Sequence, residues 1–286
     1  MAASIRILKR RIKTARNIAQ ITRAMEMVAA SKMRRAQERT LAGKPYESKL
    51  RTLVQNMVGR IEGESHPYLT KREKGKILML VFSSDKGLCG SFNTNLLRSF
   101  LRFIAENGEI EVLSIGRKLQ RPIARSGGLL VADFPIGSTL PTFEHVLPIA
   151  NFIVDVYMRQ EYRSVVALYM RFSSLSKQET IVQTILPIQK EIAQGVEATI
   201  IPYHFEPNPK YLLTSLFPHY LEMSLYQMFL ESYASEQAAR MIAMHQASDN
   251  AKEVVFELSL TYNRVRQERI TNELLDITTA TMGLGV

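Results

Sequence analysis

The fold is decided by residues 219–282, which read HYLEMSLYQMFLESYASEQAARMIAMHQASDNAKEVVFELSLTYNRVRQERITNELLDITTATM. This stretch contains no proline and no glycine, and the same is true of residues 1–42. At 1.5 Å per residue, a helix over the C-terminal stretch spans roughly 96 Å, which is wider than a globular core of this size. We therefore expect both ends of the chain to form long helices that pack on each other or on a partner.

Apolar residues recur at helical spacing in both end segments. The N-terminal stripe consists of Ile5, Leu8, Ile12, Ala15, Ile18, Ile21, Met25 and Val28. A nearly heptad stripe in the C-terminal segment consists of Met241, Met244, Ser248, Ala251, Val255, Leu258, Tyr262 and Val265. We expect the two helices to pair as a long antiparallel coiled coil. The C-terminal helix is the longer one, so its tip is expected to extend past its partner.

The middle of the chain alternates short apolar runs with helical stretches. Strands are predicted for Lys76–Ser84, Glu109–Ser114, Leu129–Phe134, Ser164–Phe172 and Glu179–Pro187, and helices for Phe92–Glu106, Arg117–Arg125 and Thr142–Glu161. This alternation is typical of an α/β domain with a largely parallel sheet. The predicted fold class is α/β, with a central Rossmann-like domain (70–205) between an N-terminal coiled-coil helix (1–60) and a C-terminal one (210–286).

The positive charge of the chain is an N-terminal feature. The formal net charge is +10, and residues 1–39 alone carry eleven Lys and Arg against two Glu. Cys89 is the single cysteine, which excludes an intrachain disulfide. Because no run of about 18 apolar residues exists, we expect any membrane association to be indirect.

No motif for nucleotide, metal or covalent chemistry stands out. The loop Ser84–Ser91 (SDKGLCGS) follows a predicted strand, where a doubly wound sheet binds ligands, but it fits neither glycine-rich phosphate motif. We interpret it as a tight strand-to-helix turn and Cys89 as a buried, inert residue. No cofactor and no metal are expected. An α/β enzyme that uses this loop is a weaker alternative, and a basic coiled-coil nucleic-acid-binding protein is the main one.

Five blocks resemble the gamma subunit of F-type (proton-translocating) ATP synthases. They are RIKTARN (Arg11–Asn17), ITRAMEMVAASKMRRAQ (Ile21–Gln37), SSDKGLCGSFNTN (Ser83–Asn95), YASEQAARMIAMHQASDNA (Tyr233–Ala251) and RITNELLDI (Arg269–Ile277). The blocks lie in the order of that family, and the resemblance covers the whole chain. One departure is Ala280-Thr281-Met282, which stands where the family has a Gly-Ala pair followed by small residues.

The resemblance implies a central-stalk rotor subunit without a catalytic site of its own. Proton flow turns the membrane ring of c subunits and the stalk with it. The stalk's asymmetric surface then drives ATP synthesis in the catalytic head of alpha and beta subunits, and ATP hydrolysis reverses the rotation. A small epsilon subunit lies beside the foot, and no nucleic acid is involved. Since the family pattern starts almost at Met1, no organelle targeting peptide is expected. The implied location is peripheral, on the cytoplasmic face of the bacterial plasma (inner) membrane.

The resemblance also implies which residues contact these partners. Positions that meet a catch in a catalytic subunit of the head are matched by Arg240, Gln267 and Thr271. Positions near the acidic lever of that subunit are matched by Met25 and its basic neighbours Arg23, Lys32, Arg34 and Arg35. Positions that touch the rotor ring are matched by Tyr203 and Glu206.

Overall fold

The computed structural model describes residues 2–60, 66–137, 139–175, 178–188, 206 and 208–283. Two long helices lie at the ends of the chain, α1 (Ala2–Arg60) and α5 (Pro209–Gly283). The chain divides into two compact units. Unit 1 consists of Met1–Ala29 with Arg240–Val286, and unit 2 consists of Ala30–Ala239. Each long helix therefore contributes one part to each unit.

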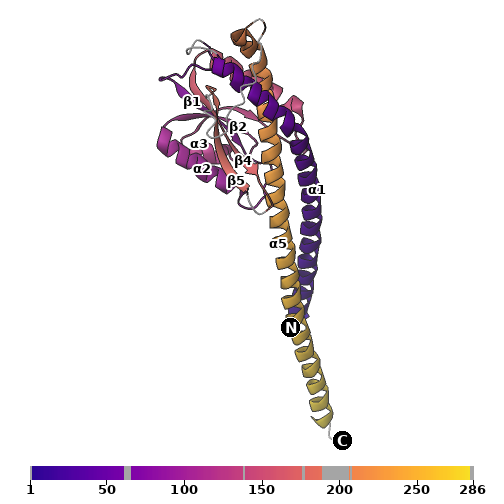
Figure 1. Cartoon of the computed structure of the whole chain (residues 1–286). Coiled ribbons are helices and arrows are strands. Elements are labelled where there is room, and N and C mark those ends of the chain that lie inside the picture. The colour runs from indigo at the N-terminus through magenta and orange to yellow at the C-terminus, as the bar shows by residue number, and fades with distance from the viewer. Residues whose placement is uncertain are drawn as a thin grey trace. The chain divides into compact units, whose positions relative to one another are not determined.

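Unit 2 contains a five-stranded sheet with helices between its strands (Figure 1). In chain order the elements are β1 (Lys76–Phe82), α2 (Phe92–Asn107), β2 (Ile110–Ile115), α3 (Gln120–Arg125), β3 (Leu129–Phe134), the 3-10 helix η1 (Phe143–His145), α4 (Leu147–Met158), β4 (Tyr162–Phe172) and β5 (Gln178–Leu186). The strand order is β3-β2-β1-β4-β5, and only β5 runs antiparallel to its neighbour. The predicted α/β fold with a largely parallel sheet is confirmed.

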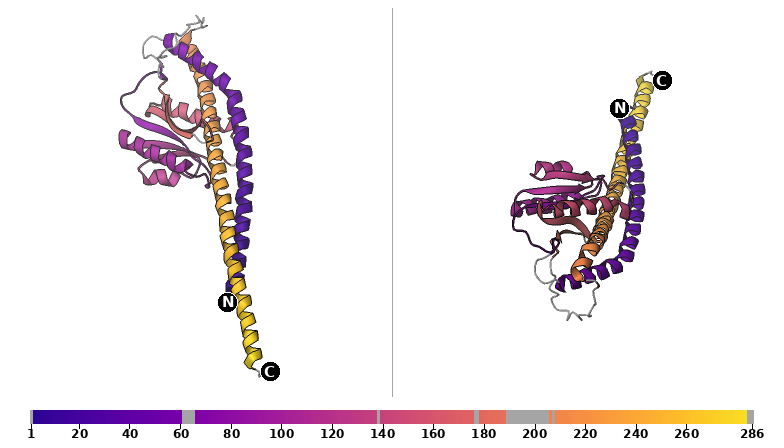
Figure 2. Two further views of the ribbon diagram at one scale, coloured as in Figure 1. Left: turned by 60° about the horizontal axis from the view of Figure 1, so that its bottom comes forward. Right: turned by 90° about the horizontal axis from the view of Figure 1, so that it is seen from above.

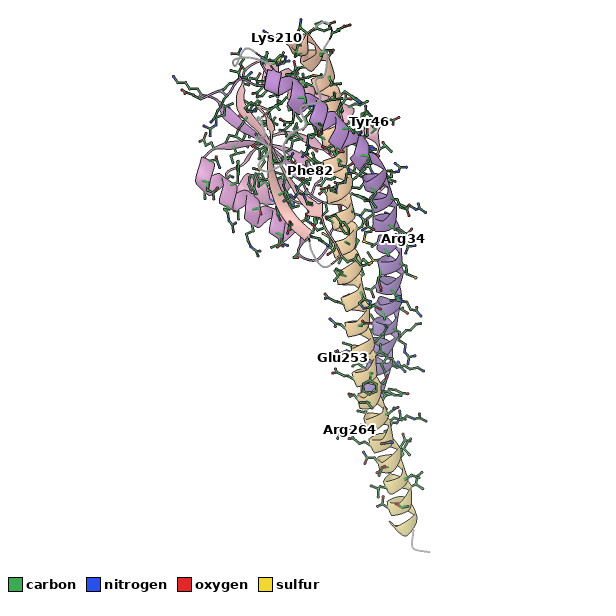
Figure 3. The ribbon with its side chains drawn as sticks, in the orientation of Figure 1. Arg34, Tyr46, Phe82, Lys210, Glu253 and Arg264 are labelled. Atoms are coloured by element: carbon green, nitrogen blue, oxygen red, sulfur yellow. The ribbon has the colours of Figure 1, made fainter. Side chains whose placement is uncertain are left out.

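Strand β1 shows how the sheet is buried on both faces. Its alternate residues Leu78, Leu80 and Phe82 pack with α4, the end of α1 and the first half of α5. The other apolar residues of the strand, Ile77, Met79 and Val81, pack with α2 and α3 on the opposite face. Since successive side chains of a strand point to opposite faces, a continuous apolar run suits a strand covered on both sides. Phe82, labelled in Figure 3, is fully buried.

Within unit 2, α1 and α5 run antiparallel. The Gln227 side chain on α5 donates a hydrogen bond to the carbonyl of Thr40 on α1, at 3.0 Å, and the Tyr46 hydroxyl lies 2.9 Å from Nε2 of His219. Pro45, which has no backbone N–H, lies inside α1 shortly after Thr40. Figure 3 labels Tyr46 in this part of α1.

Unit 1 is an antiparallel pair of helices, and its two segments lie side by side in both views of Figure 2. The Ser248 hydroxyl donates to the carbonyl of Ala19 at 3.4 Å, and Nδ1 of His245 lies 3.2 Å from Oε1 of Glu26. The stripe predicted on α5 is confirmed as its less exposed face, with Met244 at 4% and Ser248 at 1% exposure.

The stripe predicted on α1 is partly wrong. Ile18, Ile21 and Val28 are 48%, 60% and 55% exposed, although the prediction placed them on the buried face. The less exposed residues instead follow a strict heptad of mostly small side chains, in steps of three and four: Ile12, Ala15, Ala19, Thr22, Glu26, Ala29, Met33 and Ala36. Small side chains on a helix face let the partner backbone approach closely, so the large apolar residues are left outside the contact.

Candidate partner-binding surface

Unit 1 exposes large apolar side chains along both of its helices. On α1 these are Ile7, Ile18, Ile21, Met27 and Val28. On α5 these are Val254, Phe256, Leu260, Ile270, Leu274, Leu275 and Ile277. Scattered exposed apolar residues are ordinary, but a helix pair with more large apolar groups outside than inside is typical of a surface that a partner covers.

The last turns of α5 are exposed all round. Every residue from Arg266 to Thr279 is exposed, which includes the candidate head contacts Gln267 and Thr271. Ala19 lies opposite Ser248, and because the two helices are antiparallel, each step back along α1 corresponds to one step forward along α5. The start of α1 therefore lies opposite about residue 265. The remainder of α5 therefore passes beyond the helix that covers the rest of its seam. Figure 3 labels Arg264 just before this part.

Arg23 and Met25 lie on α1 beside a network of charges that joins the helices of unit 1. Arg23 forms an ion pair with Glu26 at 3.0 Å, and Glu26 also contacts His245. The second ring nitrogen of His245 lies 3.4 Å from Asp249. A hydrogen bond from Lys252 lowers the pKa of Asp249 below its usual range, and the charges of Lys252, His245 and Arg23 add to the effect. Met25 itself is half-buried, and Arg23 is exposed.

The remaining candidate head contacts differ in their exposure. Arg240 is only 9% exposed, so its side chain is part of the packing of the free chain. Arg34, labelled in Figure 3, and Arg35 are exposed, whereas Lys32 is half-buried. Unit 1 holds Arg23, Met25, Arg240, Gln267 and Thr271, and unit 2 holds Lys32, Arg34 and Arg35.

The candidate ring contacts are placed only in part. Glu206 is exposed, and Tyr203 lies outside the described residues. No helix among the residues the structure describes has both the length and the hydropathy to cross a membrane.

The glycine-rich loop after β1 is tied to its neighbours by its own side chains. The Asp85 carboxylate accepts the backbone N–H groups of Arg117, at 3.1 Å, and of Gly137, at 2.5 Å. Cys89 is 3% exposed, and the Asn93 amide donates to its sulfur at 3.3 Å. The predicted burial of Cys89 is confirmed. The bonds of Asp85 hold the loop against the ends of β2 and β3, as the interpretation as a tight turn requires.

Sequence reasoning missed two features of this surface. It selected the large apolar residues of α1 for the seam, although the spacing of Ala15, Ala19, Thr22 and Ala29 carries the heptad signal. It also gave no role to His245, because a lone histidine on a helix carries no signal until the facing carboxylates of Glu26 and Asp249 are known.

Known proteins match this chain over nearly its whole length. The family described as ATP synthase matches residues 4–284. The ATP synthase gamma chain of Dehalococcoides mccartyi (strain CBDB1) is 43% identical over 279 residues, which cover 96% of this chain and 97% of that protein. The ATP synthase gamma chain of Trichlorobacter lovleyi is 38% identical over 279 residues, covering 96% of each chain.

Solved structures show the same fold. A chain in the central stalk and c-ring structure of the Tetrahymena thermophila mitochondrial ATP synthase is 27% identical, with a TM-score of 0.60, and covers 80% of this chain and 99% of its own. A chain of the Euglena gracilis mitochondrial ATP synthase has a TM-score of 0.69 over 99% of this chain and 95% of its own, and at 17% identity it supports the fold alone. With a family match from residue 4 to residue 284 and relatives of one name along that length, the chain belongs to the ATP synthase gamma chain family.

Proposed function

We propose that this chain is the rotor of the central stalk of an F-type ATP synthase. Its rotation couples proton flow through a membrane ring of c subunits to ATP synthesis, and in reverse to ATP hydrolysis, in a head of alpha and beta subunits. The chain contributes shape and stiffness, and the catalytic sites belong to the head. Membership of the gamma chain family and the likeness to a central-stalk chain support this role.

The observation that carries the proposal is the surface of unit 1. Its exposed apolar side chains alternate with exposed charged ones, such as Glu253 and Arg264, both labelled in Figure 3. A rotor needs contacts that hold in one orientation and break in the next. Mixed apolar and charged contacts allow this, whereas a continuous dry apolar interface locks one angle.

The proposed contacts follow the family pattern. The head is contacted by the exposed end of α5 through Gln267 and Thr271, by Arg240, and by α1. The α1 residues that face the acidic lever are Arg23, Met25, Lys32, Arg34 and Arg35. Tyr203 and Glu206 contact the rotor ring, and an epsilon subunit binds beside the α/β domain. The complex is peripheral on the cytoplasmic face of the bacterial inner membrane, and residues 70–205 form its foot between the helical segments 1–60 and 210–286.

The double variant Gln267→Ala/Thr271→Ala tests the proposed head contact. Both side chains are exposed, so we expect the urea midpoint of the isolated chain to stay unchanged. In a complex reconstituted with alpha and beta subunits, the loss of two hydrogen-bonding groups at about 0.5–1.5 kcal/mol each is expected to lower ATPase turnover about tenfold. The matched control is Thr52→Ala, at an exposed threonine of α1 in unit 2, which should leave turnover unchanged.

Two outcomes contradict the proposal. Wild-type turnover in the double variant removes the coupling role of these residues. Failure of the purified chain to co-purify with the two larger subunits, together with steeply salt-dependent DNA binding, favours the nucleic-acid alternative.

A further inference from the structure

A buried histidine lies where three segments of unit 2 meet. His66 is 2% exposed and lies in the turn between α1 and β1. Its Nδ1 accepts a hydrogen bond from the backbone N–H of Tyr68 at 3.2 Å. Its Nε2 lies 2.9 Å from Oγ1 of Thr214, in the second turn of α5. Lys210, labelled in Figure 3, lies one turn earlier on that helix.

The bonding around Thr214 determines the protonation state of the ring. The Thr214 hydroxyl donates its proton to the carbonyl of Lys210 at 3.1 Å, so its oxygen acts as an acceptor toward His66. His66 therefore donates from Nε2 and accepts at Nδ1, which is one tautomer of the neutral imidazole. One proton on the ring satisfies both contacts.

Tyr68 extends the same junction to β5. Its ring centroid lies 4.1 Å from that of Phe217 on α5, and its carbonyl accepts the backbone N–H of Ile188, just after β5, at 2.8 Å. Residues 66–68, in the segment after α1, thus contact Ile188 beyond the end of β5 and the first turns of α5. Tyr68 and Phe217 are buried, so the junction is excluded from water on this side.

A second proton on the ring has no favourable place. It must bind at Nδ1, where it faces the N–H of Tyr68, so the bond is lost and a buried donor is left unpaired. Among the described residues, the titratable groups that act on the ring are Lys210 on α5 and Tyr68 on its own segment. Burial lowers the pKa of His66, and the positive charge of Lys210 lowers it further.

We propose that His66 is an acid-sensitive latch, and that proton uptake by its ring releases the segment after α1 from α5 and from the end of β5. This device is independent of the proposed rotor role, because it concerns the packing of unit 2 alone. The unfolded chain binds the proton with the ordinary histidine pKa of about 6.5, and the folded chain binds it less readily. The latch is therefore intact above about pH 6.5, and its contribution to stability is lost progressively as the pH falls below that value.

Urea unfolding of the full chain at pH 7.5 and pH 5.5 tests the latch. Because the His66 ring takes up a proton more readily in the unfolded chain, the equilibrium constant for unfolding is expected to be up to about tenfold larger at pH 5.5 than at pH 7.5. His66→Asn keeps an acceptor at the place of Nδ1, and His66→Gln keeps a donor at the place of Nε2. Neither side chain titrates. In both variants we therefore expect this part of the acid loss, that is, of the loss of stability between pH 7.5 and pH 5.5, to be absent. The control His245→Gln removes a histidine from unit 1, and this variant should retain the part of the acid loss that depends on His66.

A second variant keeps the test decisive if substitution of His66 prevents folding. Lys210→Met removes an exposed charge without touching the ring, so the acid loss should become smaller at low ionic strength. Hydrogen exchange locates the effect. Amides of residues 66–70 and 210–217 should lose protection relative to those of β1 in the wild type at pH 5.5, and not in the two His66 variants.

The latch is excluded if the unfolding midpoints of the wild type and the His66 variants shift in parallel between the two pH values. It is equally excluded if the amides of residues 66–70 and 210–217 show no loss of protection in the wild type at pH 5.5.

Discussion

Unit 2 buries most of its large apolar side chains, whereas unit 1 leaves most of its own in contact with solvent. In unit 2, strand β1 alone contributes six buried residues, from Ile77 to Phe82. Among the residues of unit 1 whose burial the structure describes, the buried apolar ones are Ile12, Ala15, Ala29, Met244 and Ala251, and three of these five are alanines. Unit 2 is therefore stabilised by a core of its own. The stability of unit 1 depends on the helices themselves and on whatever covers them.

The polar contacts of the two units also differ in their burial. In unit 2, Glu111 is 8% exposed, and its carboxylate accepts hydrogen bonds from Lys76 and, at 2.5 Å, from the Tyr162 hydroxyl. Burial raises the pKa of Glu111, but these two bonds and the positive charge of Lys76 together outweigh it, so the pKa lies below the usual value. In unit 1 the Asp249 side chain that pairs with Lys252 is 51% exposed. Exposed ion pairs contribute little to stability, so the network of unit 1 does not replace a core.

The largest expected effect is the difference in stability between two Phe→Ala variants, one in each unit. Phe82→Ala removes a fully buried ring from unit 2 and should lower the free energy of unfolding by about 3–5 kcal/mol. Phe256 is 64% exposed in unit 1, so Phe256→Ala should change it by no more than about 0.5 kcal/mol. Urea unfolding of both full-length variants measures the difference. Similar losses in the two variants would mean that the contrast in burial does not govern stability.

A smaller effect is expected at the helix contact of unit 1. Ala29 is 1% exposed, so Ala29→Leu forces a larger side chain into a closely packed seam and should cost about 1–3 kcal/mol. The neighbouring Val28 is 55% exposed, and Val28→Leu should stay within about 0.5 kcal/mol. Unfolding by urea compares the two. If Ala29→Leu is neutral, the small residues of α1 do not set the distance between the helices.

Sequence patterns were sufficient for the fold because its signals are local. A run such as Lys76–Phe82 is apolar at every position after the first, which identifies a strand covered on both faces. The long stretches without proline or glycine likewise predict α1 and α5, although Pro45 and Pro218 both lie inside the helices. Near Pro45 the Gln227 side chain of α5 bonds to the carbonyl of Thr40 on α1, and a sequence alone does not display such a contact.

The candidate site was less predictable, because its features depend on residues far apart in the chain. Hydrophobicity ranks Ile18 and Ile21 above Ala19 and Thr22, yet the latter pair is the less exposed, since close approach of two helices favours small side chains. His66 gave no signal either. Its role follows from Thr214, which is 148 positions away. Similarity to a family predicts which residues contact partners, but burial such as that of Arg240 requires the structure.

The smallest expected effect concerns the intrinsic stability of α5 in unit 1. Glu257 is exposed, and Glu257→Gly should destabilise the helix by about 1 kcal/mol relative to Glu257→Ala, which removes the same charge. Because few buried contacts hold this segment, the loss should appear as faster local hydrogen exchange, while the amides of β1 in unit 2 remain unchanged. In the proposed rotor, the glycine variant should also pump protons less efficiently per ATP than the alanine variant, since a locally softer helix transmits less torque. Equal exchange in the two variants would show that packing, and not helix propensity, holds unit 1 together, as it does unit 2.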